Sequence, residues 1–146
     1  MGDCYNKIEI HSPISDVWNT ISNFHDMTWA TGVIINVSKI GDKKGTEIGA
    51  KRVINGVIHE TLTNFDPNTF TFSYSIDHGS GPISNFVRNY FVVVKLTSTE
   101  SGTLVQWHSS FESDNDNDVK GFLYPMYSTL LSALKKTLSD NQRCEN

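Results

Sequence analysis

Two residues of opposite charge, Arg52 and Glu60, stand in neighbouring stretches of alternating apolar residues. The turn dipeptide Asn55-Gly56 lies between them, so a hairpin is expected to bring the two stretches together. A two-residue loop there would put Lys51 opposite Glu60, whereas a three-residue loop with Gly56 left-handed gathers apolar residues on one face. We favour the three-residue loop, which makes Arg52 and Glu60 diagonal neighbours on the inner face, about 7–8 Å apart at the backbone.

Such a pair can do three kinds of chemistry. Buried charges are costly unless paired, so the two residues could form a structural ion pair that orients neighbouring side chains. They could also bind the polar end of a ligand. Finally, Glu60 could act as a general acid or base, because a carboxyl group in an apolar cavity has a raised pKa. The sequence offers no second strong acid/base partner, so no residue is assigned as catalytic and Glu60 is the candidate if a reaction takes place.

Aromatic residues with a hydrogen-bonding tip accompany this pair. An apolar body with a polar tip suits a cavity that holds a mostly apolar molecule with a few polar groups, although each of these residues could equally be core packing. The predicted ligand-binding residues are Arg52, Glu60, Tyr74, Tyr90, Trp107, Phe122, Met126, Tyr127 and Leu130.

Other chemistry-bearing patterns do not complete a site. The acidic run Asp114–Asp118 imitates the opening of a calcium loop, but Val119 replaces the required glycine and Pro125 the bidentate glutamate. Helix capping explains these acids. The five histidines have no ligand spacing, and Cys4 and Cys144 fit no metal or redox motif. We therefore expect neither a metal nor a cofactor.

The composition describes a globular protein of one domain, residues 1–146, with 38% hydrophobic and 19% charged residues. A net charge of -4 argues against nucleic acid as a partner. No apolar run approaches the length of a membrane span, so stable membrane insertion is not expected. The expected partner is an apolar small molecule, and the expected protein is a cytoplasmic monomer or homodimer with reduced cysteines.

The periodicity of the chain predicts an α+β fold. A helix begins at Ser12-Pro13, and His25–Trp29 indicates a second short helix or a turn. Six strands separated by short turns follow a first strand, which makes the sheet antiparallel; the predicted strands are 5–11, 34–40, 46–53, 57–65, 69–76, 86–97 and 103–111. The loop Gly79–Pro82 is a candidate lid or entrance.

The last helix, Asn117 to Asp140, presents apolar residues over roughly 200° of its circumference. A helix on a flat surface needs a stripe only a little over 100° wide. The broad arc, which includes Phe122 and Tyr124, indicates a helix gripped by something curved, or else a well-buried core helix.

This order of elements resembles the polyketide cyclase/dehydrase and lipid-transport superfamily, the START-like (SRPBCC) or helix-grip fold. The resemblance extends from about Tyr5 to Leu138, and its carriers are the helix start Ser12–Trp18, Trp29 ahead of Gly32, Arg52, Glu60-Thr61-Leu62, the segment Gly81–Phe86, and Val105-Gln106-Trp107 with Phe111. It implies a seven-stranded curved antiparallel sheet wrapped around the C-terminal helix, two short helices between strands 1 and 2, and an elongated cavity.

Family members typically bind lipids, polyketides, isoprenoid quinones, plant hormones or other apolar small molecules, and some are aromatase/cyclases. The resemblance therefore implies binding, transport or sensing of an apolar small molecule between the sheet and the helix. The alternative is a polyketide cyclase, aromatase or dehydratase that uses the same cavity. A third possibility is a module that docks another protein.

Overall fold

The computed structural model describes residues 2–79 and 87–145, with side chains described up to residue 139. Within these ranges the chain forms the elements β1 (Gly2–Ile10), α1 (Ile14–Ile21), β2 (Val37–Ile40), β3 (Lys51–Ile54), β4 (Ile58–Asp66), β5 (Thr71–His78), β6 (Val87–Ser98), β7 (Thr103–Ser113) and α2 (Asp116–Glu145). The strands form one antiparallel sheet in the order β1-β7-β6-β5-β4-β3-β2. The predicted α+β class, the seven-stranded antiparallel sheet and the long C-terminal helix are confirmed.

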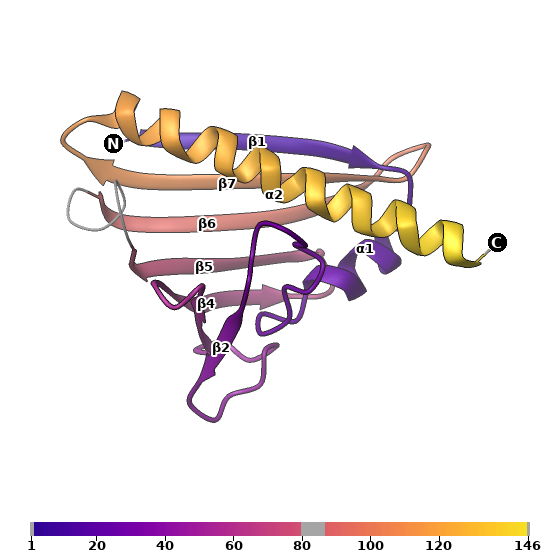
Figure 1. Ribbon diagram of the computed structural model, residues 1–146, viewed down its shortest axis with the longest axis horizontal. Coiled ribbons are helices and arrows are strands. Elements are labelled where there is room, and N and C mark those ends of the chain that lie inside the picture. The colour runs from indigo at the N-terminus through magenta and orange to yellow at the C-terminus, as the bar shows by residue number, and fades with distance from the viewer. Residues whose placement is uncertain (1, 80–86, 146) are drawn as a thin grey trace.

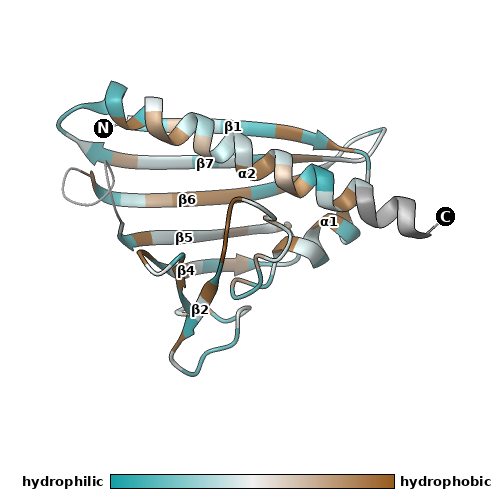
Figure 2. Ribbon diagram, viewed as in Figure 1, coloured by the Kyte–Doolittle hydropathy of each residue, from teal (hydrophilic) through white to brown (hydrophobic). Residues whose placement is uncertain are grey.

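Helix α2 lies across one face of the sheet on the β1–β7 side, and its C-terminal end runs past α1 (Figure 1). The β2 end of the sheet turns away from the direction of the other strands, so the sheet is strongly twisted (Figure 1). Apolar stretches colour the middle of β6 and the segment that leads into β2 (Figure 2).

The buried face of α2 is narrower than the sequence arc predicts. It consists of Val119, Leu123, Tyr127, Leu130, Leu131, Leu134 and Leu138, at the three- and four-residue spacing of an ordinary amphipathic stripe. Phe122 is 40% exposed and Tyr124 is 56% exposed. The prediction that Phe122 and Tyr124 belong to the buried arc of the helix is therefore wrong. The helix packs on one face of the sheet, and the edges of its apolar arc extend beyond that contact.

A buried amide from β1 fixes α2 beside its internal proline. The Asn6 Nδ2 group donates hydrogen bonds to the Tyr124 carbonyl oxygen (3.1 Å) and to the Ser128 hydroxyl oxygen (2.9 Å). Pro125 lies between these two partners and lacks a backbone N–H. Asn6 therefore sets the position of the turn that carries Met126 and Tyr127.

The second short helix implied between strands 1 and 2 is wrong, and the alternative of a turn at His25–Trp29 is confirmed, because the described chain after α1 forms successive turns. The Asn23 side chain accepts a hydrogen bond from the His25 backbone N–H (3.0 Å), and the Asp26 side chain accepts one from that of Thr28 (3.0 Å). Such local side-chain bonds offer the backbone an alternative to helix. These turns direct Met27 toward the centre of the molecule.

The β3–β4 hairpin has the predicted faces but a different register. Asn55 (φ 52°) and Gly56 (φ 75°) are both left-handed, and the Val57 N–H bonds to the Ile54 carbonyl oxygen (3.0 Å). The type I′-like turn leaves Val57 as an extra residue, so the strands pair with Arg52 directly opposite Glu60. The prediction that Arg52 and Glu60 are diagonal neighbours is therefore wrong, because they are directly opposite each other. Both side chains lie on the inner face, as expected.

The strands around this hairpin also differ in length from the predictions. The third strand begins at Lys51 instead of residue 46, because left-handed Gly49 (φ 95°) ends the extended run, and Ile48 is 57% exposed. In the next ladder Glu60 pairs with Ile76 and Leu62 with Tyr74, and register shifts flank these pairs. Most of the candidate lid, 79–82, and the whole 81–86 motif lie outside the described residues.

Candidate functional site

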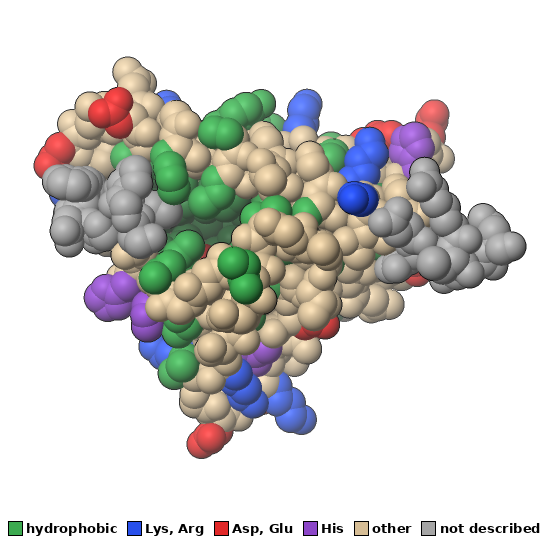
Figure 3. Space-filling view, viewed as in Figure 1, with side chains coloured by type: hydrophobic (Ala, Val, Ile, Leu, Met, Phe, Trp, Pro, Cys, Tyr) green, Lys and Arg blue, Asp and Glu red, His purple; other side chains and the backbone are tan. Residues whose placement is uncertain are grey.

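A pocket of about 50 Å³ lies between α2, strands β3 to β6 and the turn segment before β2. It opens in a hollow of the visible surface that is surrounded by hydrophobic side chains (Figure 3). Its volume accommodates one or two water molecules, whereas pockets for drug-sized ligands measure about 300–1,000 Å³. The side chains that line the pocket would have to move for a larger molecule to enter.

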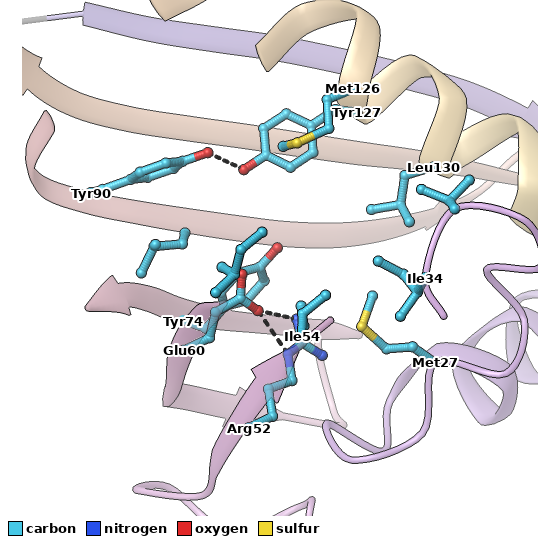
Figure 4. Close-up of a pocket in the computed structure, with 13 residues that line it drawn as sticks. Met27, Ile34, Arg52, Ile54, Glu60, Tyr74, Tyr90, Met126, Tyr127 and Leu130 are labelled. Atoms are coloured by element: carbon cyan, nitrogen blue, oxygen red, sulfur yellow. Dashed lines mark hydrogen bonds and ion pairs between the residues drawn. The ribbon is translucent and has the colours of Figure 1, made fainter. Parts of the chain in front are cut away.

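The pocket brings together seven of the nine predicted ligand-binding residues: Arg52, Glu60, Tyr74, Tyr90, Met126, Tyr127 and Leu130. Figure 4 shows these side chains converging from α2, β6, β5 and the β3–β4 hairpin. Trp107 is buried but does not line the pocket; its ring packs behind Tyr74 and Tyr127, at centroid distances of 6.5 and 6.3 Å. Phe122 is exposed and lies outside the lining.

Sequence reasoning missed part of the wall. The further lining residues are Met27, Val33, Ile34, Ile54, Ile58 and Ile76. Ile58 and Ile76 occupy inward-facing positions of their strands, so the alternating sequence pattern could have identified them. Met27 and Ile34 come from irregular chain, and the segment is held by Asn55, whose side-chain oxygen accepts the Ile35 (2.7 Å) and Asn36 (3.2 Å) backbone N–H groups. No periodic signal marks such a contact.

Arg52 and Glu60 form a buried ion pair in which a single carboxylate oxygen, Glu60 Oε1, makes both contacts with the guanidinium. The Arg52 Nε and Nη2 groups lie 2.7 and 2.6 Å from Glu60 Oε1, and Nη1 donates to the Phe24 carbonyl oxygen at 2.9 Å. The guanidinium carbon also lies 3.8 Å from the centre of the Phe24 ring and 4.9 Å from that of Tyr74. The pair is thus built into the wall, as the structural interpretation expects.

The second carboxylate oxygen of Glu60, Oε2, receives no hydrogen bond from the residues that the structure describes. Burial raises the pKa of Glu60, and the adjacent Arg52 guanidinium opposes the rise. Because the guanidinium stays protonated, a neutral Glu60 would leave a buried positive charge without a partner. We therefore treat the pair as ionised at neutral pH, with Oε2 as an available acceptor.

Three tyrosine hydroxyls lie near this carboxylate. Tyr90 and Tyr127 are hydrogen-bonded to each other through their hydroxyls (Figure 4). The Trp107 indole N–H interacts weakly with the Tyr74 hydroxyl but is hydrogen-bonded to no described group. Burial raises the pKa of all three phenols, so each keeps its proton at neutral pH and can donate it.

We expect Tyr127→Phe to lower the free energy of unfolding by about 1 kcal/mol, because it removes the buried hydrogen bond to Tyr90. Urea unfolding of the purified variant measures this loss. The control is Tyr124→Phe, three residues earlier in α2, where the side chain is exposed and the change should stay within about 0.5 kcal/mol. Equal stability of the two variants would show that the tyrosine pair contributes nothing.

Among the described residues, no group of three or more His, Cys, Asp or Glu side chains could hold a metal ion. None of the described helices is long and apolar enough to cross a membrane. The polar side chains among the described residues that line the pocket are those of the Arg52–Glu60 ion pair and the three tyrosines, and the other lining residues are apolar.

Comparisons with known proteins cover almost the whole chain. A family model described as polyketide cyclase / dehydrase and lipid transport matches residues 1–139. A solved protein from Nitrosospira multiformis is 30% identical, with a TM-score of 0.91, over 97% of this chain and 99% of its own. A search of the curated proteins finds no match.

More distant structures share the fold alone. A Bacillus cereus protein has a TM-score of 0.81 at 24% identity and covers 97% of this chain and 99% of its own. A Thermobifida fusca protein also has a TM-score of 0.81, at 19% identity, and covers 92% of this chain and 91% of its own.

Proposed function

Because the chain belongs to the polyketide cyclase / dehydrase and lipid transport family, we propose that it binds an apolar small molecule, such as a lipid, polyketide or isoprenoid, between the sheet and α2. The observation that carries the proposal is the pocket itself, an apolar wall interrupted by the Glu60 carboxylate and three phenols. A plain core would close this space with aliphatic side chains. Binding could serve transport or sensing of the same ligand.

Entry of such a ligand requires the pocket to widen, and its wall contains suitable parts. Met27 and Met126 have flexible unbranched side chains that adapt to irregular shapes. Met27 and Ile34 also stand on irregular chain, which can shift without breaking a strand or helix. We place the adjustable side of the pocket here and the fixed side at the ion pair.

A neutral fluorescent dye tests the proposal. N-phenyl-1-naphthylamine should gain fluorescence on titration with the protein and saturate at one molecule per chain. Addition of 4-pentylphenol, a small amphiphile with one polar group, should displace it competitively. Fluorescence that never saturates, or that no apolar competitor reverses, would contradict binding in a defined pocket.

The second candidate function is a cyclase, aromatase or dehydratase activity in the same pocket. The raised pKa of Glu60 and its available Oε2 atom favour it, because a general acid or base must reach the substrate. Glu60→Gln should then abolish turnover of a polyketide-like substrate while binding persists. Turnover that survives the replacement would remove Glu60 from that role.

A further inference from the structure

We propose that the polar end of the ligand is an uncharged hydroxyl group, as in a phenol or an alcohol, held by Glu60 and Tyr74, and that carboxylates are rejected. The hydroxyl would donate its proton to Glu60 Oε2 and accept a hydrogen bond from the Tyr74 hydroxyl. This inference rests on the proposed function and specifies its ligand class.

Arg52, although it is a cation in the pocket wall, is not free to bind an anion. Its charge is already matched by Glu60, with two of its nitrogen atoms within 2.7 Å of Oε1. A third nitrogen is held by the Phe24 carbonyl oxygen, and two aromatic rings lie against the guanidinium. The Arg52–Glu60 pair is neutral overall, and the negative Glu60 would lie beside an incoming carboxylate. The cost of desolvating that carboxylate would therefore not be compensated.

The remaining polar atoms complement a hydroxyl group on both sides. Glu60 Oε2 is an acceptor without a hydrogen-bond partner among the described residues. The Tyr74 hydroxyl donates its proton to no described group. Its oxygen interacts only weakly with the Trp107 indole N–H. Figure 4 shows the Glu60 and Tyr74 side chains pointing toward the same space. A hydroxyl that both donates and accepts satisfies the two together.

The rest of the lining excludes a second charge on the ligand. The remaining wall is apolar and includes Met27, Ile34, Ile54, Met126 and Leu130. Tyr90 and Tyr127 are hydrogen-bonded to each other at the far end, where one hydroxyl is the donor and the other is the acceptor. The pocket thus combines neutral hydroxyl groups and one donor–acceptor position with an apolar surround, which favours a molecule with a neutral polar end.

Three ligands of nearly equal shape test the inference at pH 7: 4-pentylphenol, 4-pentylbenzoate and pentylbenzene. Calorimetry, or displacement of N-phenyl-1-naphthylamine, gives the three dissociation constants. We expect the phenol to bind about tenfold or more tighter than either of the others, as a hydrogen bond to a buried charged acceptor allows.

Two variants locate the selectivity. Glu60→Gln keeps the shape but removes the charge that neutralises Arg52, so the benzoate should bind at least tenfold tighter to it than to the unmodified protein. Tyr74→Phe should weaken the phenol about fivefold and leave pentylbenzene unchanged. The Tyr74 variant carries the test alone if Glu60→Gln does not fold, because it removes one atom from a residue that retains its ring contacts.

The outcomes separate the two proposals. If none of the three ligands binds, the proposed function fails and the inference fails with it. If the benzoate binds the unmodified protein as tightly as the phenol, or pentylbenzene does, binding stands and the hydroxyl assignment is overturned. Phenol affinity that is unchanged in Tyr74→Phe would also overturn it.

Discussion

Arg52→Met is expected to lower the free energy of unfolding by about 3–5 kcal/mol at pH 7, because it leaves the Glu60 carboxylate buried without its counter-charge. Urea unfolding followed by circular dichroism measures the loss. The double variant Arg52→Met/Glu60→Leu should recover most of it, since a buried ion pair can often be replaced by packed apolar side chains at little cost. A single variant as stable as the double would contradict a buried, mutually dependent pair.

The same variant should be sensitive to pH in a defined direction. The pKa of Glu60 is raised in the folded protein from its ordinary value of 4.5, and loss of Arg52 removes the group that limits the rise. A raised folded-state pKa gives stability that is present below the unfolded pKa and lost as pH rises through the folded one. The deficit of Arg52→Met should therefore be smaller at pH 4 than at pH 7.

A matched control comes from the surface of the molecule. Arg88 pairs with Asp114 at 3.3 Å, with side chains that are 54% and 82% exposed. Exposed ion pairs contribute little, so Arg88→Met should change the free energy of unfolding by no more than about 0.5 kcal/mol. A loss as large as that of Arg52→Met would mean that burial is not what makes the inner pair important.

Met126→Trp is expected to weaken binding of 4-pentylphenol at least tenfold, because the larger indole would fill a pocket of only about 50 Å³. Dye displacement measures the affinity. A circular dichroism spectrum that matches that of the unmodified protein shows that the variant is folded. Phe122→Trp is the control, since Phe122 lies four residues earlier on α2, is exposed and does not line the pocket. Equal losses in the two variants would place the ligand elsewhere.

The faces of the strands could be predicted from the sequence, because inward and outward residues alternate along each strand. That pattern was enough to place Arg52, Glu60 and Tyr74 on the inner face. The exact pairing was not predictable in the same way, because it depends on two consecutive left-handed residues, Asn55 and Gly56, and on the bulges in the β4–β5 ladder.

The other errors have separate physical causes. The helical pattern of α2 records which residues are apolar but not where the sheet ends, so Phe122 was placed in the wall although it lies outside it. Ile34 was missed because tertiary hydrogen bonds to the Asn55 side chain hold its segment against the hairpin, and Met27 because it lies in an irregular turn. No local sequence signal encodes contacts of this kind.

Methionine methyl NMR during a 4-pentylphenol titration tests the central claim most directly. Met27 and Met126 line the pocket from two separate elements, the turn segment and α2 (Figure 4). If the ligand binds between the sheet and α2, both methyl signals should shift, saturate together and give the dissociation constant found by dye displacement. Saturable binding that leaves both methyl signals in place would contradict the claim.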